Sequence, residues 1–163
     1  MTIVNRDKVL SGYNGNLESV VHTERMTNGL FVALGELEGG ERDLYKVVAP
    51  SAGNIETEEF LLVCAPEVMY DERLYRKRDF VIEAGTAARA FRMAKGDVLT
   101  LTNDLFDGAL PKKGDLVAPA TNGSMKLTKT TKETKSTLVF KVIAEDSLDV
   151  VEGEALRIKA IKA

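Results

Sequence analysis

The chain has 163 residues, of which 44% are hydrophobic and 6% aromatic, with no tryptophan. This length suits one compact domain, or one domain with an arm, and the hydrophobic content argues against wholesale disorder. The net charge of −3, from 22 basic and 25 acidic residues, provides no global attraction to nucleic acid or to an anionic membrane.

The N-terminus carries charges where a secretory signal would have an apolar stretch, and no apolar run approaches the length that spans a bilayer. We therefore expect a soluble protein made in a reducing compartment, with no membrane partner. Cys64, the single cysteine, excludes an intramolecular disulfide and lies in an apolar run. We interpret it as a small hydrophobe in the core.

Residues 1–28 are predicted to form an extended N-terminal arm. Turn signals occur at 14–16 and 27–29, and the apolar residues are spaced too widely for an amphipathic helix. An arm with this many apolar residues gains by packing on its own core or on a partner. The candidate partner-binding residues of the arm are Ile3, Val4, Val9 and Leu10.

Residues 29–66 are predicted to contain three strands. Residues 29–37 and 43–49 resemble the two strands of a hairpin, with a turn at 38–41. The apolar run 60–64 is typical of a buried strand, and Ala65-Pro66 closes it.

Residues 67–93 contain the one plausible helical stretch. Residues 70–79 are dense in charge and in good helix formers, which predicts a short helix or an extended loop. Short strands are expected near 80–83 and 88–93. Arginine and tyrosine are enriched at interface hot spots, although a solvated helix face is the default interpretation. The candidate partner-binding residues of this stretch are Arg73, Tyr75, Arg76 and Arg78.

Residues 94–163 return to short strands, at 98–102, 116–118, 125–130 and 138–144, with an edge or surface strand at 155–161. Asn122-Gly123 is a strong hairpin signal. The predicted fold class is therefore mostly β, with at most one or two short helices. A small β-barrel or β-sandwich-like body, for which a β-tulip-like form is one option, would span residues 29–163 as a single domain behind the arm of residues 1–28.

Gly29, Gly96 and Gly114 each precede a strand. The three segments that begin with these glycines share only residues typical of turns and recur at no fixed period. We therefore interpret the glycines as turn residues rather than as marks of an internal duplication.

The sequence contains no catalytic constellation that we can identify. His22 is the only histidine and has no identifiable partner, and the acidic residues at 56, 58 and 59 lack the spacing of a calcium loop. Phosphate-loop, dinucleotide and zinc motifs are missing. We therefore expect a protein that is not an enzyme, with no catalytic residue, no cofactor and no metal.

A basic stripe formed by Lys126, Lys129, Lys132 and Lys135 precedes an acidic segment at 145–154. One interpretation is a soluble barrel module that binds nucleic acid or glycan through this stripe, although the stripe has no aromatic side chain for base stacking. A second is head-to-tail contact between identical subunits. A solvated hairpin tip is the default.

Five segments of the chain resemble the head decoration or cement proteins of tailed bacteriophages, a family of small capsid-associated structural proteins. They are NGLFVALG (28–35), ERDLY (41–45), APEVMYDE (65–72), AGTAARAFR (84–92) and KGD (95–97). The resemblance covers most of residues 28–123. It implies a virion protein that binds the outer surface of the capsid and stabilises it, after synthesis in the bacterial host cytoplasm. The implied partners are the major capsid protein and further copies of the chain, as a homotrimer, rather than nucleic acid.

Overall fold

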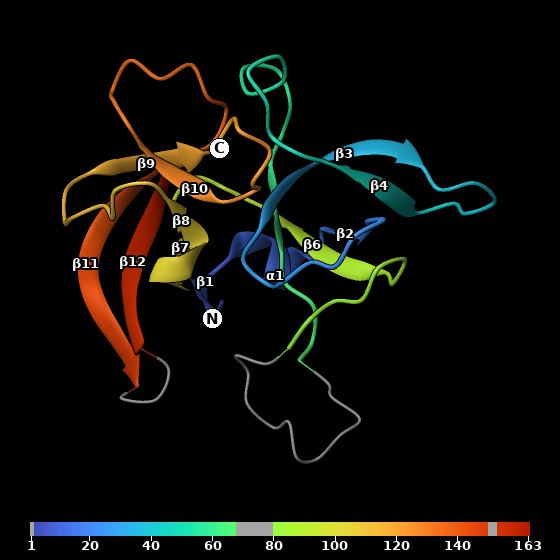
Figure 1. Cartoon of the computed structure of the whole chain (residues 1–163), viewed down its shortest axis with the longest axis horizontal. Helices are drawn as coiled ribbons and strands as arrows, with labels where there is room; N and C mark the ends of the chain where they lie inside the picture. Colours follow the sequence, from blue (N-terminus) through green and yellow to red (C-terminus); the bar gives the residue numbers. More distant parts are fainter. Residues whose placement is uncertain (1, 68–79, 150–152) are drawn as a thin grey trace.

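The computed structural model describes residues 2–67, 80–149 and 153–163 and shows a mostly β protein built from two sheets (Figure 1). The first set of strands comprises β2 (Leu17–Val21), β3 (Phe31–Leu37), β4 (Leu44–Val48), β5 (Leu61–Val63) and β6 (Ala88–Arg92). They close a barrel in the order β2-β4-β3-β5-β6. The prediction of a small, mostly β body is confirmed.

The second sheet has seven strands. They are β1 (Val4–Lys8), β7 (Val98–Thr102), β8 (Phe106–Asp107), β9 (Leu116–Pro119), β10 (Leu127–Thr130), β11 (Val139–Asp149) and β12 (Gly153–Lys162). Their order is β1-β7-β12-β11-β9-β10-β8. The short helix α1 (Leu10–Asn14) connects β1 to β2, and the 3-10 turn η3 (Asn103–Leu105) follows β7. No helix among the described residues has the length and apolar character to cross a membrane.

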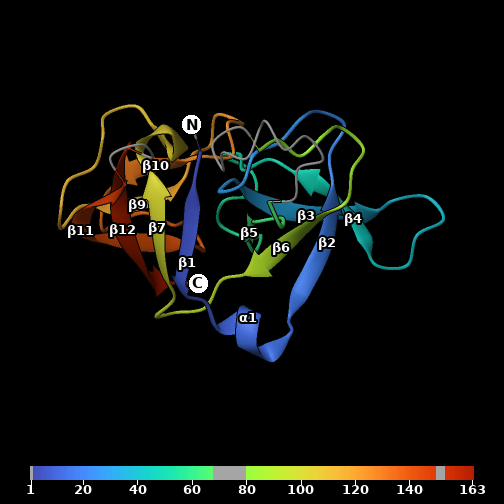
Figure 2. The same cartoon turned by 90° about the horizontal axis from the view of Figure 1, so that it is seen from below.

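The prediction of a separate N-terminal arm is wrong for its described residues. Strand β1 pairs antiparallel with β7, with Val4 opposite Leu101, and β2 pairs with both β4 and β6. The two strands therefore belong to different sheets, and α1 crosses between them (Figure 2). The scattered apolar residues fit no helix because they pack in two separate places: Val4 in the core shared by both sheets, and Val20 among the barrel strands.

A single hydrophobic core joins the barrel to the seven-stranded sheet. It contains Phe31 and Leu62 from the barrel together with Leu101 and Phe140 from the sheet. The rings of Phe31 and Phe140 meet edge to face, with centroids 5.5 Å apart. Along β3 and β5, neighbouring side chains point alternately into this core and into a second cluster. Phe31 and Leu62 belong to the core, whereas Val32 and Leu61 belong to the second cluster, which lies within the barrel. Strand β5 is therefore buried on both faces, as the apolar run predicted.

The sequence predicted an edge or a surface strand at 155–161. The edge alternative is wrong, because β12 pairs with β11 on one side and β7 on the other. Its apolar–basic alternation reflects one buried and one outward face, with Ile158 buried and Lys159 exposed. Near 80–83 the described chain forms only an isolated bridge between Ile82 and Met26. The predicted helix or loop at 70–79 lies outside the described residues.

The glycines that precede strands have left-handed backbones, with φ of +94° at Gly29, +102° at Gly96 and +95° at Gly114. This agrees with their interpretation as turn residues, because only glycine adopts such φ values without strain. Gly29 has a second role. A Cβ atom there would overlap the side chain of Leu105 and lie 2.7 Å from Val4 Cγ2, whereas at Gly96 it would meet nothing within 4 Å. The start of β3 thus passes closely against the second sheet.

We expect Gly29→Ala to destabilise the protein more than Gly96→Ala. Both variants carry the left-handed backbone cost of roughly 1–2 kcal/mol. Gly29→Ala alone also overpacks the junction of the two sheets, which costs a further ~1–3 kcal/mol. Urea unfolding of the two variants measures the difference. Equal losses of unfolding free energy would contradict the close approach at Gly29.

Candidate functional site

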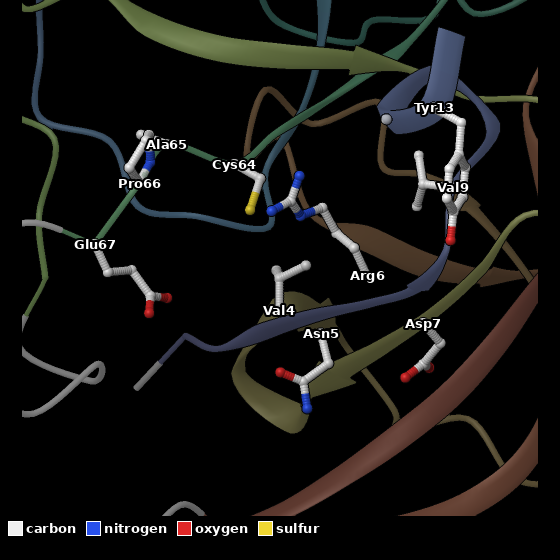
Figure 3. Close-up of a pocket in the computed structure, with 11 residues that line it drawn as sticks. Val4, Asn5, Arg6, Asp7, Val9, Tyr13, Cys64, Ala65, Pro66 and Glu67 are labelled. Atoms are coloured by element: carbon white, nitrogen blue, oxygen red, sulfur yellow. The ribbon is translucent and has the colours of Figure 1, made fainter. Parts of the chain in front are cut away.

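A cleft of about 600 Å³ lies between β1 and the segment that follows β5 (Figure 3). Residues 4–7, Val9, Gly12 and Tyr13 line it on the N-terminal side, and residues 64–67 line it on the other. One wall therefore comes from the edge of the seven-stranded sheet and from α1. The opposite wall comes from the chain leaving the barrel.

The four N-terminal candidates do not form one exposed surface. Ile3 is only 1% exposed, and Val4 and Val9 are buried in the shared core, although both also border the cleft. Leu10 is 51% exposed and is the one member of the four that a partner can contact fully. The candidates Arg73, Tyr75, Arg76 and Arg78 lie outside the described residues.

Sequence reasoning missed Tyr13, which is 84% exposed at the rim of the cleft. Leu10 and Tyr13 are three residues apart on α1 and so lie on the same side of that helix turn. The i, i+3 spacing of these two residues was the sequence signal from which a shared exposed face could have been predicted. The turn residues Gly12 and Gly15 around it favoured a loop instead.

Helix α1 is held at both ends. At its start, the buried Asp97 carboxylate accepts hydrogen bonds from the backbone N–H of Leu10 and from that of Ala94, both at 2.9 Å. At its end, Gly15 adopts a left-handed conformation with φ of +67°, as is common after a helix. The Asp97 carboxylate thus ties the exposed helix to the turn between β6 and β7.

Arg6 connects the two sheets across the floor of the cleft. Its guanidinium lies 4.4 Å from the ring centroid of Phe91 on β6, which is a cation–π distance. Figure 3 shows the Arg6 side chain extending from β1 toward Cys64. Sequence reasoning did not identify Arg6, because the contact joins residues 85 positions apart (91 − 6) in different sheets.

Cys64 is buried, as predicted. Burial raises the pKa of its thiol, and the nearby Glu67 carboxylate adds to this effect, while the positive charge of Arg6 partly opposes it. The protonated thiol is the dominant form at neutral pH, and it is a poor nucleophile. Within the described ranges no group of three or more His, Cys, Asp or Glu side chains could hold a metal ion.

Two of the three acidic residues at 56–59 have basic partners instead. Glu59 forms an ion pair with Arg92, which also pairs with Glu18 at 2.8 Å. Glu56 lies 3.4 Å from Lys135. His22 Nδ1 accepts a hydrogen bond from the backbone N–H of Glu24 at 3.0 Å. These side chains therefore stabilise local structure.

The basic stripe is largely balanced by carboxylates. Lys129 Nζ lies 2.7 Å from Asp115 Oδ2, and Lys135 pairs with Glu56 as described above. Hydrogen bonds from Ser124 and Asn122 lower the pKa of Asp107, and the charge of Lys126 lowers it further. Three of the four lysines thus have a carboxylate nearby, which weakens the stripe as a binding surface for polyanions.

Comparisons with protein-family models, with curated proteins and with solved structures each gave no match to the chain. Among the described residues, the surfaces open to a partner include the exposed α1 pair, the cleft beside it and the charged clefts of the second sheet.

We expect the Cys64 thiol to react slowly with a chromogenic aromatic disulfide in the folded protein, because its raised pKa lowers the thiolate fraction and the side chain is buried. Unfolding in guanidinium should accelerate the reaction. A Cys64→Ala/Leu37→Cys variant, with its thiol at a 43% exposed position, is the matched control. A folded wild-type protein that reacts as fast as this control would contradict the burial.

Proposed function

We propose that the chain is a structural virion protein that binds the outer surface of a bacteriophage capsid and stabilises it. The resemblance of the segments within residues 28–123 to head decoration and cement proteins supports the class of partner, the major capsid protein. The exposed pair Leu10 and Tyr13 supports the place of contact. The proposed location is the capsid exterior, after synthesis in the host cytoplasm, and the role involves no catalysis.

The observation that carries this proposal is the apolar surface of α1. The helix projects from the molecule between β1 and β2 (Figure 2). Tyr13 is the most exposed of the large hydrophobic side chains that the structure describes. An aromatic side chain in this position gains apolar burial and a hydrogen bond on docking, which explains why tyrosine is frequent at interface hot spots. The cleft beside it offers a recess for side chains of the partner.

The surface is also pre-organised for binding. Because β1 and β2 belong to different sheets and Asp97 holds the start of α1, Leu10 and Tyr13 are positioned before any partner binds. A flexible arm would lose roughly 1–2 kcal/mol of backbone entropy per residue on ordering. A helix fixed between two sheets avoids most of this loss, so a small contact suffices for useful affinity.

The alternative function, a module that binds nucleic acid or glycan through the stripe of residues 126–135, has less support. The ion pairs of Lys129 and Lys135 occupy two of its four cations. Binding to oligonucleotides that weakens steeply with salt remains the test that would favour it.

We expect a Leu10→Ala/Tyr13→Ala variant to bind empty capsid shells of the phage that encodes the chain at least about tenfold more weakly than wild type, because hot-spot truncations typically cost about 2 kcal/mol or more. Co-sedimentation with shells that lack the protein measures the affinity. Circular dichroism and the Tm should be unchanged, since both side chains are exposed.

Leu37→Ala is the matched control, because Leu37 is similarly exposed but lies on the barrel hairpin β3–β4. Wild-type protein that fails to bind shells would refute the function, whereas a double variant with wild-type affinity would refute only the α1 surface. Deletion of residues 1–25 is unsuitable as a test, because it removes β1 and β2 and with them part of both sheets.

A further inference from the structure

The long hairpin formed by β11 and β12 has a basic cleft near the C-terminus of the chain. The cleft has a volume of about 530 Å³ and is lined by Lys132, Lys141 and Lys162 together with apolar side chains that include Val139 and Ile161. The Lys162 ammonium also donates a hydrogen bond to the carbonyl oxygen of Ser136. None of the described residues that line the cleft carries a carboxylate. Within the described part of the chain, neither Lys132 nor Lys141 has an ion-pair partner.

The other end of the same hairpin is acidic. A second cleft, of about 520 Å³, is lined by Glu145, Asp146 and Glu154, and Lys112 is the cation among its described lining residues. The exposed side chain of Leu110 provides an apolar contact beside these carboxylates. The two clefts thus have similar sizes, opposite charges and apolar side chains at their edges.

The two ends cannot neutralise each other within one molecule. Strands β11 and β12 run side by side across the sheet (Figure 1). Because β12 spans Gly153–Lys162, Glu154 and Lys162 lie toward its opposite ends. Eight residues (162 − 154) separate them on an extended strand, which corresponds to about 26 Å. This exceeds the Debye length of about 8 Å at physiological salt, so each end attracts an external partner independently.

We propose that the acidic surface formed by Glu145, Asp146 and Glu154 in one copy of the chain docks against the basic cleft of a second copy, head to tail. Every copy carries both surfaces, so the complementary partner is always present at equal concentration. The contact is heterologous and closes into a ring where the rotation between copies allows. This interaction goes beyond capsid binding, since it occurs between copies of the protein in solution.

A polyanion such as nucleic acid is the less suitable occupant of the basic cleft. The three lysines surround apolar side chains, and the cleft has no aromatic side chain on which a base could stack. The acidic surface on the hairpin, with the exposed Leu110 of the β8–β9 segment beside it, matches both the charge and the apolar side chains of the basic cleft. Competition by an oligonucleotide distinguishes the two occupants.

The test uses charge reversal on each side of the contact. Lys132→Glu/Lys141→Glu makes the basic cleft acidic, and Glu145→Lys/Glu154→Lys makes the acidic end basic. We expect wild-type protein to self-associate in sedimentation velocity at low ionic strength, and to dissociate near 1 M salt, where the Debye length is about 3 Å. Each variant alone should lower the association constant at least about tenfold, because like charges then face each other.

An equimolar mixture of the two variants provides the decisive measurement. In the mixture the unchanged acidic end of the first variant meets the unchanged basic cleft of the second, and the two reversed surfaces also match each other. We expect the mixture to recover the association of wild type. The control Arg42→Glu/Lys46→Glu reverses two exposed cations on the barrel and should associate like wild type.

Wild-type protein that stays monomeric at low ionic strength would refute the proposal, as would a mixture that does not recover association. A control variant that dissociates equally would show that net charge alone governs the effect. An oligonucleotide that binds the basic cleft while self-association persists would likewise assign that cleft to polyanions. None of these results bears on shell binding through α1, which is measured separately.

Discussion

The edge-to-face contact between Phe31 and Phe140 is the interaction on which the rest of the structure depends. It lies in the one core that combines barrel and sheet residues, and such a pair contributes ~0.5–1.5 kcal/mol beyond the area it buries. Because that core holds the two sheets against each other, α1 can cross between them in a defined position. The narrow space around Gly29 is a consequence of the same close packing.

The two proposed interaction surfaces lie on different parts of this frame. The α1 surface is apolar and is held by Asp97 and by strands from both sheets. The charged surfaces lie on β11 and β12, within the seven-stranded sheet alone. A partner bound at α1 therefore need not displace a neighbouring copy at the hairpin, so one molecule can contact a shell and its neighbours together.

Much of the strand pattern was predictable, because alternation and turn residues are local properties. The hairpin β3–β4, the buried strand β5 and the first part of β11, residues 139–144, follow directly from their apolar residues. The extension of β11 to Asp149 through an acidic segment was not predicted. The site was less predictable. Leu10 was identified, but Tyr13 and Arg6 were missed, since the exposure of one and the ring contact of the other depend on segments distant in sequence.

The sequence by itself determined a mostly β protein with a buried cysteine and with glycine turns before three of its strands. Only the tertiary structure decided that residues 4–21 contribute strands to two sheets, that β12 is internal, and that the lysines at 129 and 135 have acidic partners. The physical reason is that strand neighbours and ion pairs join residues far apart in the chain, which local patterns do not specify.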